Sequence, residues 1–446
     1  MNDLLKTLLG NLDAGAARRA QLETYYQGQQ PLAYLAPEAR AAIGNRFSLM
    51  STNLPRTAVN ALAERLRVTG FAGQGAETVW ADWKRCDLDQ RAPIAHREAL
   101  TLGEAFIIVW ADAQGQPLVT VESAAQVAVT RDPATGEVLA AVKRWETTTG
   151  TEAVLYQPDR VTRLHSDALG AATWTGFRTV QTLENPLGVV PVVPLRNSDR
   201  LLGGPTSEID DLAPLVDGLN KLLGDMMVAS EYSGRPRRWA TGIELDEVDV
   251  LDADGNPTGE TVTVNPFPDS NRMMISEGSE TKFGQLDAAD LASYEAAVRV
   301  LQAQVSAVTG LPPHYLGVHG DQPASADALR ASEASLTAKA EARQQTFGRA
   351  WEQVARLMLA IRTGADPGGI VLAVQWADPS TRSVAQEADA VVKLFSAGLL
   401  PATYALKRLG YSDDEVAQIE QARRTEALQA AGTQLAGLLP ATVVTA

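Results

Sequence analysis

The feature that most constrains the fold of this chain is the run from 325 to 363, which contains no proline and one internal glycine, Gly348. Large apolar side chains recur in its second half at intervals of three and four residues, the spacing of one face of an α-helix. These residues are Phe347, Trp351, Val354, Met358 and Ile361. A helix of this extent is roughly 55 Å long at a rise of about 1.5 Å per residue. Few compact single-domain enzymes need so long an unbroken rod.

Two helices with narrow apolar seams precede this run. In the first, apolar residues recur at intervals of three and four: Ile209, Leu212, Val216, Leu219, Leu223 and Met226. The second has the same spacing: Leu291, Tyr294, Val298, Leu301, Val305 and Val308. We expect the first helix to begin near Asp211, because Pro214 lacks an amide hydrogen and fits best in a first turn. The sequence Gly310-Leu-Pro-Pro ends the second helix.

A strand-and-turn segment separates these two helices. It runs from Arg235 to about Ile275 and includes the β-prone sequence Thr261-Val-Thr-Val. Helices with narrow seams, separated in this way, are suited to packing beside copies of themselves. When each copy contacts the next through two different surfaces and the rotation closes, the copies form a ring.

The first two hundred residues predict a mixed helical and antiparallel-sheet domain. Helical spacing extends to about Leu66, and Trp80 and Trp83 lie on one helix face that would enter a core. The apolar stretch from Ala105 to Ala111 predicts a buried strand, and Arg131-Asp-Pro-Ala-Thr-Gly marks a hairpin. Near the other end, a strand is expected from Ile370 to Gln375, followed by helices from 383 to about 429 that glycines 398 and 410 separate. The predicted class is α+β and mostly helical, and 446 residues predict two or more structural units.

The composition excludes several classes of protein. Cys86 is the only cysteine, so neither an intrachain disulfide nor a cysteine-cluster zinc site is possible. The longest apolar stretches are too short to cross a bilayer, and the N-terminus lacks the order of a signal peptide, so we expect cytosolic synthesis and no membrane partner. The chain has 39 basic and 54 acidic residues, which argues against tight binding of nucleic acid through its phosphates. The same balance is compatible with a surface that DNA slides past, and equally with an ordinary acidic enzyme.

Two patterns resemble metal sites but fail at identifiable positions. His314 and His319 are five residues apart in a proline-containing loop, without the helical spacing of a zinc pair. Asp252, Asp254 and Asn256 imitate the start of a calcium-binding loop. Proline at 257 and threonine at 263 stand where that loop needs glycine and a bidentate glutamate. We interpret the second pattern as a hairpin turn and predict no metal site.

The sequence also lacks the common catalytic motifs. It contains no phosphate-binding loop ending in Gly-Lys-Ser/Thr and no Gly-x-Ser-x-Gly nucleophile elbow. Asp210 and Asp211 are adjacent, but neighbours in a helix point about 100° apart, so charge at a helix start explains them better. We therefore predict no catalytic or cofactor-binding residue and no cofactor. Carboxylates that meet only in three dimensions leave no trace in a sequence, so an enzyme of another type stays an alternative.

Two further segments are candidates for contacts with a partner. Arg235, Arg237 and Arg238 form one dense basic cluster, which either satisfies a helix C-terminus or contacts DNA or an acidic partner. The loop from 310 to 323 reads GLPPHYLGVHGDQP, and its glycines and diproline keep it out of regular structure. A plain connector between two helices needs fewer residues.

Several segments appear in an order that is familiar from one family. They include Asn53 to Phe71, Asn185-Pro-Leu-Gly-Val-Val-Pro-Val-Val-Pro, Leu311-Pro-Pro-His-Tyr-Leu-Gly, Pro323-Ala-Ser-Ala-Asp-Ala-Leu-Arg with the helix to Arg362, Trp376-Ala-Asp-Pro, and Ala388-Asp-Ala-Val-Val-Lys-Leu with the following Ala-Gly-Leu-Leu-Pro. In this order the chain resembles the portal proteins of siphophages, particularly those of phages that infect actinobacteria. The similarity spans nearly the whole chain, and the combination is specific although no single segment is.

The resemblance implies a portal-type division of the chain. Residues 1–204 would form the N-terminal part of a mixed α/β wing, to which 364–380 return as a strand. Residues 205–232 and 284–310 would be the two stem helices, and 233–283 a small β-rich clip between them. Residues 311–323 would form a tunnel loop, 324–363 a long spine helix, and 381–446 a helical crown.

The resemblance also implies a function and partners. Such a chain is a subunit of a homo-oligomeric ring, usually twelve-fold, at one capsid vertex of the virion, with assembly in the host cytoplasm. Double-stranded DNA passes through the ring without sequence specificity, and the partners are the large terminase, the head-tail adaptor, and the major capsid and scaffolding proteins. The tunnel-loop residues expected at the DNA are Tyr315, Leu316, Val318, His319, Asp321 and Gln322. Two alternatives remain: an enzyme with its site in the N-terminal α/β domain, and a bacterial helical scaffold or adaptor protein.

Overall fold

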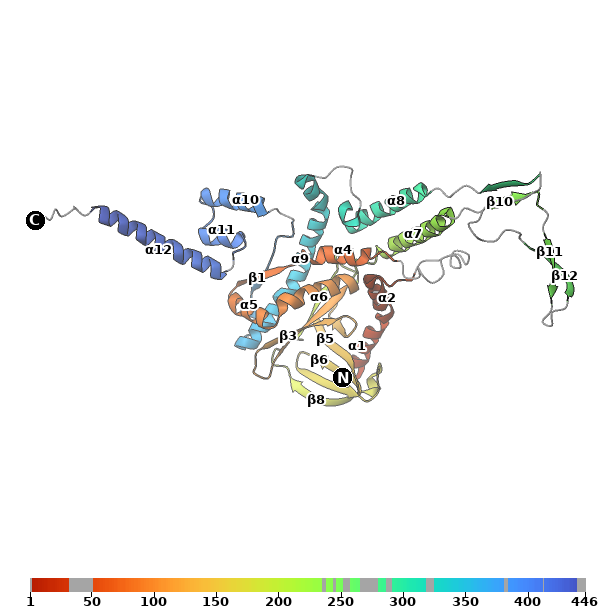
Figure 1. Ribbon diagram of the computed structural model, residues 1–446. Helices are drawn as coiled ribbons and strands as arrows, with labels where there is room; N and C mark the ends of the chain where they lie inside the picture. Colours follow the sequence, from red (N-terminus) through yellow and green to blue (C-terminus); the bar gives the residue numbers. More distant parts are fainter. Residues whose placement is uncertain are drawn as a thin grey trace, which may run out of the picture. The chain divides into compact units, whose positions relative to one another are not determined.

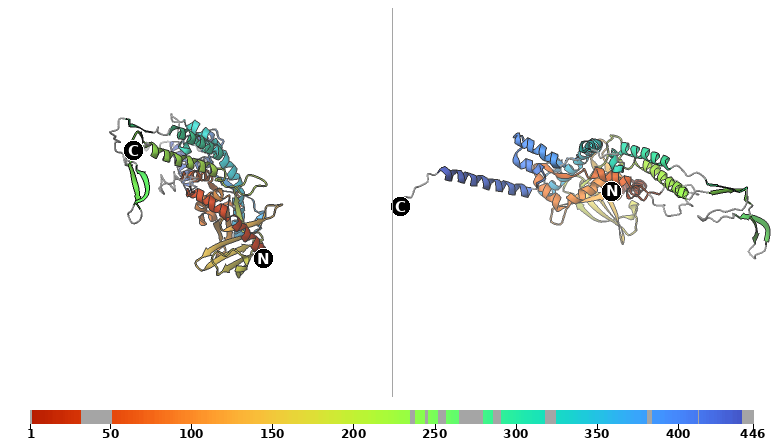
Figure 2. Two further views of the ribbon diagram at one scale, coloured as in Figure 1. Left: turned by 90° about the vertical axis from the view of Figure 1, so that its right-hand side faces the viewer. Right: turned by 45° about the horizontal axis from the view of Figure 1, so that its top comes forward.

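The computed structural model describes residues 2–31, 51–234, 238–243, 246–251, 257–264, 280–285, 291–317, 325–380, 384–411 and 413–438. The contacts within the chain divide it into two units, Met1–Pro379 and Ser380–Ala446. The first unit contains both helices and strands, and the second contains helices. Figure 1 labels these elements, and Figure 2 gives two further views. Helices and antiparallel strands together confirm the predicted α+β class.

The first unit begins with helices that surround its core. They are α1 (Asn2–Ala14), α2 (Ala16–Gln27), α4 (Leu54–Ala63), α5 (Ala76–Arg85) and α6 (Leu88–Leu102). In α4, Pro55 lies in the first turn, where a missing amide hydrogen costs no helical hydrogen bond. In α5, Trp83 is fully buried and Trp80 stacks on it with ring centroids 5.9 Å apart, which confirms that one helix face brings both tryptophans to the core.

The strands of the first unit form antiparallel sheets. Their bounds are β1 (Val68–Gly73), β2 (Glu104–Ala111), β3 (Pro117–Ser123), β4 (Val127–Arg131), β5 (Val138–Thr147), β6 (Gly150–Tyr156), β7 (Arg160–Ser166), β8 (Arg178–Glu184), β9 (Val192–Arg196) and β14 (Leu372–Trp376). One sheet has the order β3-β2-β9, a second has the order β4-β5-β6-β7-β8, and β1 pairs with β14. Short 3₁₀ turns complete the unit: η2 (Trp174–Gly176), η3 (Pro313–Leu316) and η4 (Pro367–Gly369). The buried strand and the hairpin expected in this region are confirmed by β2 and by the β4–β5 pair.

After Glu104 at its start, strand β2 is apolar, because both faces of its buried part, Ala105 to Val109, are covered. Ile107 points to the side that packs on helices, and Phe106 points to the side that packs on the five-stranded sheet. Successive side chains of a strand alternate between faces, so each face of β2 supplies a different core cluster. The far face of the five-stranded sheet is covered by the leucines of α1: Leu5, Leu8, Leu9 and Leu12.

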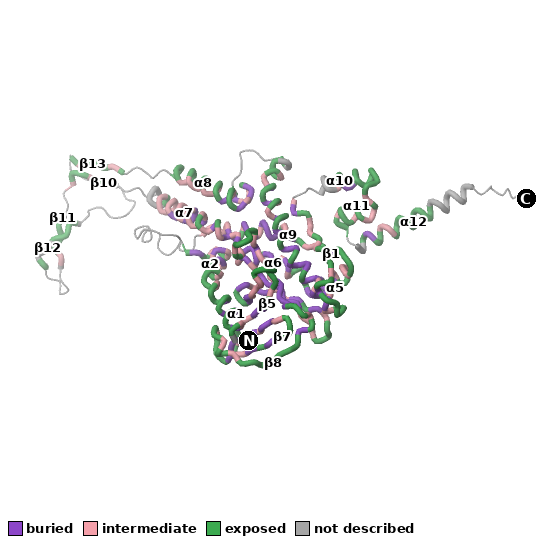
Figure 3. Tube along the Cα trace, turned by 180° about the vertical axis from the view of Figure 1, so that it is seen from behind, coloured by how far each residue is buried: buried purple, intermediate pink, exposed green. Residues whose placement is uncertain are grey.

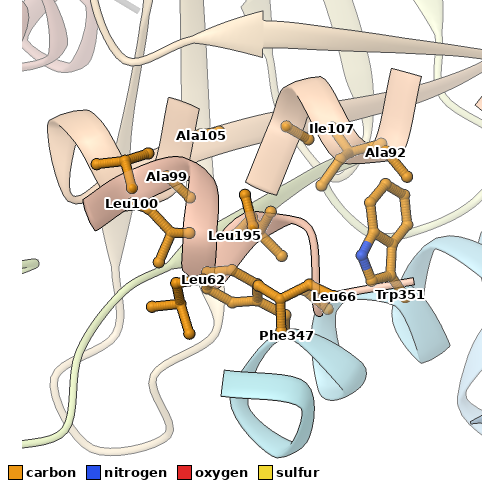
Figure 4. Close-up of a cluster of buried hydrophobic side chains, with 14 of the residues drawn as sticks. Leu62, Leu66, Ala92, Ala99, Leu100, Ala105, Ile107, Leu195, Phe347 and Trp351 are labelled. Atoms are coloured by element: carbon orange, nitrogen blue, oxygen red, sulfur yellow. The ribbon is translucent and has the colours of Figure 1, made fainter. Parts of the chain in front are cut away.

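Helix α9 (Ala326–Thr363) is the long helix that the proline-free run predicts, and its position at the core explains the apolar stripe. Phe347, Trp351, Val354 and Met358 are each completely buried, and Figure 4 shows Phe347 and Trp351 among side chains from α4, α6, β2 and β9. The internal Gly348 faces β14, where an added Cβ would lie 3.1 Å from Val374 Cγ1. A glycine there lets the strand approach the helix closely.

The two seamed helices are also present. Helix α7 (Ala213–Gly234) has Pro214 in its first turn as expected, and α8 (Ala292–Thr309) lies beside it (Figure 1). Between them, β10 (Arg238–Thr241) pairs with β13 (Lys282–Gln285), and β11 (Asp246–Leu251) pairs with β12 (Pro257–Val264). The antiparallel β11–β12 ladder confirms the hairpin, although Asp252, Asp254 and Asn256 of its turn lie outside the described residues.

The second unit contains three helices: α10 (Val384–Ser396), α11 (Ala402–Arg408) and α12 (Asp413–Leu438). Gly398 and Gly410 both have left-handed backbone angles between these helices, which confirms them as separators. Helix α12 continues to Leu438, so the expected end near 429 is wrong. Among the described residues of the whole chain, no helix combines the length and apolar character that a bilayer span requires.

Candidate functional site

The base of α7 is the first part of a site that links distant segments. Ser207 accepts a hydrogen bond from the Ile209 amide, and the Asp210 carboxylate accepts one from the Ser207 amide at 2.8 Å. This reciprocal arrangement has the hydrogen-bond pattern of a capping box, and it stabilises the turns at 207–212 that lead into α7. The structure places Asp210 and Asp211 in these turns and not in the first turn of α7, so the expected role as helix-start charge is wrong. The Asp210 carboxylate instead forms an ion pair with Arg18 of α2.

Two side chains of α7 are held by residues near the N-terminus, one in α2 and one just before α4. The Tyr25 hydroxyl donates to Asp217 Oδ2 at 2.8 Å, and burial together with this bond raises the pKa of Tyr25 to about 12. Asn220 Oδ1 accepts from both the amide and the hydroxyl of Thr52 at 2.9 Å. Asn220 is 2% exposed. The first half of α7 is thus fixed to the body of the unit.

A buried carboxylate ties the base of α7 to α9. Glu208 lies 2.6 Å from Lys339 Nζ and 3.1 Å from Arg343 Nη2, and Asn197 Nδ2 donates to it at 3.0 Å. Burial alone would raise the pKa of Glu208, but the two cations of α9 reverse this and hold it below its usual value. The carboxylate is therefore ionised and connects two helices that are remote in the sequence.

The end of α8 is fixed by a glycine cap and by hydrogen bonds to the segment that follows it. Helix α8 ends at Thr309, and Gly310 follows with φ of 74° and accordingly acts as the left-handed cap that the sequence predicts. The Ser306 hydroxyl donates to the Leu311 carbonyl at 2.7 Å, and Gln302 Nε2 donates to the Leu316 carbonyl at 3.3 Å. The segment from 311 to 317 is therefore held against the last turns of α8.

Side chains of this segment face the core. Leu316 is 8% exposed, so most of its side chain is packed in the interior. Tyr315 packs against the same core cluster, and its hydroxyl accepts from Arg65 at 3.4 Å. Arg65 also lies 3.3 Å from Glu333 of α9, and His314 Nε2 lies 3.7 Å from the other oxygen of that carboxylate. These contacts make 311–317 an anchored turn that leads into the loop.

The remaining predicted site residues lie outside the described part of the chain. Val318, His319, Asp321 and Gln322 belong to the segment 318–324, and Arg235 and Arg237 to 235–237. Arg238 is described in its backbone, where it opens β10 opposite Gln285. The structure brings Tyr315 and Leu316 together at the anchor, but it tests neither the tunnel-loop contacts nor the basic cluster.

The apolar seams of α7 and α8 are only partly covered. Ile209, Leu212 and Val216 are completely buried at the base of α7, and burial decreases toward its other end (Figure 3). On α8, Val305 is completely buried. Leu291 and Val308 of the expected seam are 37% and 45% exposed in the single subunit, and Val300, which lies beside the seam, is 61% exposed. The helix pair therefore presents apolar surface that the contact between α7 and α8 does not use.

Among the described residues, no group of three histidine, cysteine or carboxylate side chains is placed to hold a metal ion. His96 lies deep in the core, where its Nε2 accepts a hydrogen bond from Trp351 Nε1 at 2.8 Å. Burial lowers the pKa of His96 to about 3, so the ring is neutral and acts as a packed acceptor.

Sequence reasoning missed the residues that fix these helices. Glu208 and Arg343 are 135 positions apart, and Tyr25 and Asp217 are 192 apart. No local spacing signals such pairs. A partial signal existed in Ser207 and Asp210, whose three-residue separation is that of a capping box.

Comparison with known proteins agrees with this architecture. A family model described as phage portal protein, SPP1 Gp6-like, matches residues 5–429. The portal protein of Mycobacterium phage D29 is 33% identical over 410 residues, which cover 86% of this chain and 80% of that protein. The portal protein of Mycobacterium phage L5 is 33% identical over 407 residues, with the same coverage.

Solved structures with a similar chain include two described as the virion of a native gene transfer agent particle and the neck of an empty gene transfer agent particle computed with C6 symmetry. Their sequence identity to this chain is 14% in both cases, and the TM-scores are 0.45 and 0.46. They cover 89% and 86% of this chain, and 99% and 96% of their own chains are matched. The family match and the two mycobacteriophage relatives together show that this chain belongs to the SPP1 Gp6-like family of phage portal proteins.

Proposed function

We propose that copies of this chain close into a ring of twelve subunits at one vertex of a phage capsid. Double-stranded DNA would pass through the ring during packaging and ejection, without sequence-specific binding and without any reaction catalysed by the ring. The large terminase and then the head-tail adaptor would dock on it, next to the major capsid and scaffolding proteins. Assembly would take place in the host cytoplasm and end in the virion.

The observation that carries this proposal is the helix pair α7 and α8. Its base is fixed by the Glu208 and Asn220 contacts, whereas apolar side chains farther along, such as Val300, stay exposed in the single subunit. A fixed base combined with uncovered apolar surface suits side-by-side packing with the same helices of a neighbour. We accordingly assign 205–232 and 284–310 to the stem and 233–283 to the clip.

The other parts follow the same division. Residues 1–204 with 364–380 form the wing, which the pairing of β1 with β14 supports. Residues 324–363 form the spine helix and 381–446 the crown. In the tunnel loop 311–323, we now propose Val318, His319, Asp321 and Gln322 as the residues near DNA. Tyr315 and Leu316 would act as its anchor, because both pack in the core.

The acidic balance of the chain supports passage of DNA without binding. An excess of 15 negative charges favours repulsion of phosphates by the ring as a whole. A protein that binds DNA tightly would instead need a concentrated basic face.

Mass photometry of the purified full-length chain tests the proposal. We expect a species of twelve times 47.6 kDa, and we expect Val300→Glu to abolish it because a charge would enter the interface between stems. Val180→Glu is the matched control, because Val180 is 53% exposed on β8 of the wing and its replacement leaves the ring intact. Equal loss of the ring in both variants, or in neither, would contradict the assignment of the stem.

A further inference from the structure

Two cavities lie on either side of Arg19 in α2, and they have opposite character. The first has a volume of about 430 Å³ and is lined by the carboxylates of Asp13, Glu23 and Glu98, with Arg19 and Arg144 as its cations. Arg144 is paired with Asp13 at 2.6 Å. This first cavity therefore offers no excess of positive charge.

The second cavity has a volume of about 410 Å³ and is bounded by α1, α2, β2, β4 and β9. Its charged lining consists of three guanidinium groups, Arg19, Arg131 and Arg196, and one carboxylate, Glu104. Three positive charges and one negative charge leave an excess of two. Such a concentration of cations stands out in a chain whose net charge is −15.

Most of the side-chain hydrogen-bond donors that line this cavity have no partner among the described residues. Arg196 lies 3.9 Å from Glu104, a long ion pair, while Arg131 has no side-chain hydrogen bond or ion pair with any residue that the structure describes. Arg19 donates one bond to the Leu12 carbonyl, but its Nε is buried without a partner among the described residues. The Thr130 hydroxyl, also in the lining, is likewise buried without a described partner.

The donors reach the cavity from three different elements. Arg19 comes from α2, Arg131 and Thr130 come from β4, and Arg196 comes from the end of β9. Guanidinium groups bind the oxygens of phosphates and carboxylates through paired hydrogen bonds. Donors that converge from several directions suit a tetrahedral oxyanion with four oxygens better than a planar carboxylate. The excess of two charges matches a dianion.

We propose that this cavity, bounded by Arg19, Arg131 and Arg196, is a binding site for a phosphate-type dianion. The bound group is either free inorganic phosphate or the phosphate of a small phosphorylated molecule, for which a cavity of about 410 Å³ leaves room.

The electrostatics of the cavity agree with this assignment. Burial lowers the pKa of Arg131 to about 10, and the nearby charge of Arg196 lowers it in the same direction. Burial also raises the pKa of Glu104. Both shifts follow first from the burial of charged groups in the cavity, and a bound dianion would relieve the repulsion between the guanidinium groups.

Isothermal titration calorimetry of the full-length chain with sodium phosphate at pH 7 tests the site, with sodium chloride used to hold the ionic strength constant. We expect saturable binding of one phosphate per chain. Arg131→Gln should weaken it about tenfold or more, since a hydrogen bond to a charged group is lost. Arg131 has no hydrogen bond or ion pair to lose among the described residues, so the variant should keep the unliganded melting temperature.

Glu104→Gln gives a second, opposite readout. It removes the carboxylate that competes with the ligand for Arg196, so phosphate should bind more tightly than to the unchanged chain. Arg178→Gln is the charge control, because Arg178 is 68% exposed on β8 and lies outside the cavity lining. A purely structural role for the arginines would not produce opposite changes in affinity for the two cavity variants.

A titration with 2′-deoxyadenosine 5′-monophosphate separates the two sources. Tighter binding than that of phosphate assigns the site to a phosphorylated small molecule, and equal or weaker binding assigns it to free phosphate. The proposal is overturned if phosphate shows no saturable binding, if Arg131→Gln binds as tightly as the unchanged chain, or if acetate binds as tightly as phosphate.

Discussion

At the scale of single residues, Glu208 is the contact on which the base of α7 most depends. Its side chain is 7% exposed, and it faces Lys339 and Arg343 of α9. Removing one partner of a buried ion pair leaves the others uncompensated, so Glu208→Gln should lower the free energy of unfolding by about 3 kcal/mol. Urea denaturation of the purified chain measures this. Glu295→Gln is the control, because its pair with Arg299 is exposed and its loss should change the midpoint little.

The same carboxylate should make stability depend on pH. The pKa of Glu208 is lowered in the folded chain, so its contribution is fully present above the pKa of an unfolded glutamate, about 4.3. The contribution is lost as pH falls from there through the folded pKa. The difference in unfolding free energy between the unchanged chain and Glu208→Gln should therefore be constant from pH 7 to pH 5 and shrink below pH 4.3. A difference that grew on acidification would contradict the assignment.

At the scale of elements, two glycines end helices with the same backbone conformation but different surroundings. Gly310 ends α8 with φ of 74°, and Gly364 ends α9 with φ of 69°. An added Cβ at Gly310 would lie 2.9 Å from Ser335 Oγ, whereas at Gly364 nothing lies within 4 Å. Alanine at either position should cost about 1 kcal/mol for the left-handed conformation, and Gly310→Ala should cost more because of the contact with α9. Equal unfolding midpoints for the two variants would show that a Cβ at position 310 makes no unfavourable contact with Ser335 of α9.

The loop after α8 gives a functional prediction at the same scale. Replacing 318–322 with glycine and serine should leave the ring intact, because the anchor at Tyr315 and Leu316 is kept. It should reduce the yield or the length of packaged DNA, because the proposed DNA-facing side chains are removed. Electron microscopy of the purified ring and gel analysis of DNA from particles measure the two effects. Unchanged DNA in intact particles would remove this loop from the channel.

Elements whose limits are set by residues close in the sequence could be predicted well, and features set by distant residues could not. The limits of α9 were predicted to within a residue, since Ser325 caps its start and Gly364 its end through contacts with near neighbours. The burial of Ala105 to Val109 in β2 was likewise visible in the apolar sequence from Ala105 to Ala111. The exposure of Val308, by contrast, depends on where α7 lies beside α8, which heptad spacing does not specify. The spacing identified a seam but not the part of it that remains uncovered.

At the scale of the whole molecule, the contacts between segments far apart in the chain could not be predicted from the sequence. A strand at 370–375 was expected, but its pairing with β1, with Phe71 opposite Val374, joins residues some three hundred positions apart. The cavity around Arg131 arises in the same way, because its arginines come from three separate elements. The resemblance to portal proteins predicted the order of the parts, since a family shares its long-range pairings even where single residues do not signal them.

The central claim is that this chain is a subunit of a closed portal ring. Electron-microscopy class averages of the purified full-length chain, viewed end-on, test it most directly. We expect closed rings with a central channel and twelve repeats around it. A preparation that contained only single, correctly folded chains at micromolar concentration, or only open filaments, would contradict it.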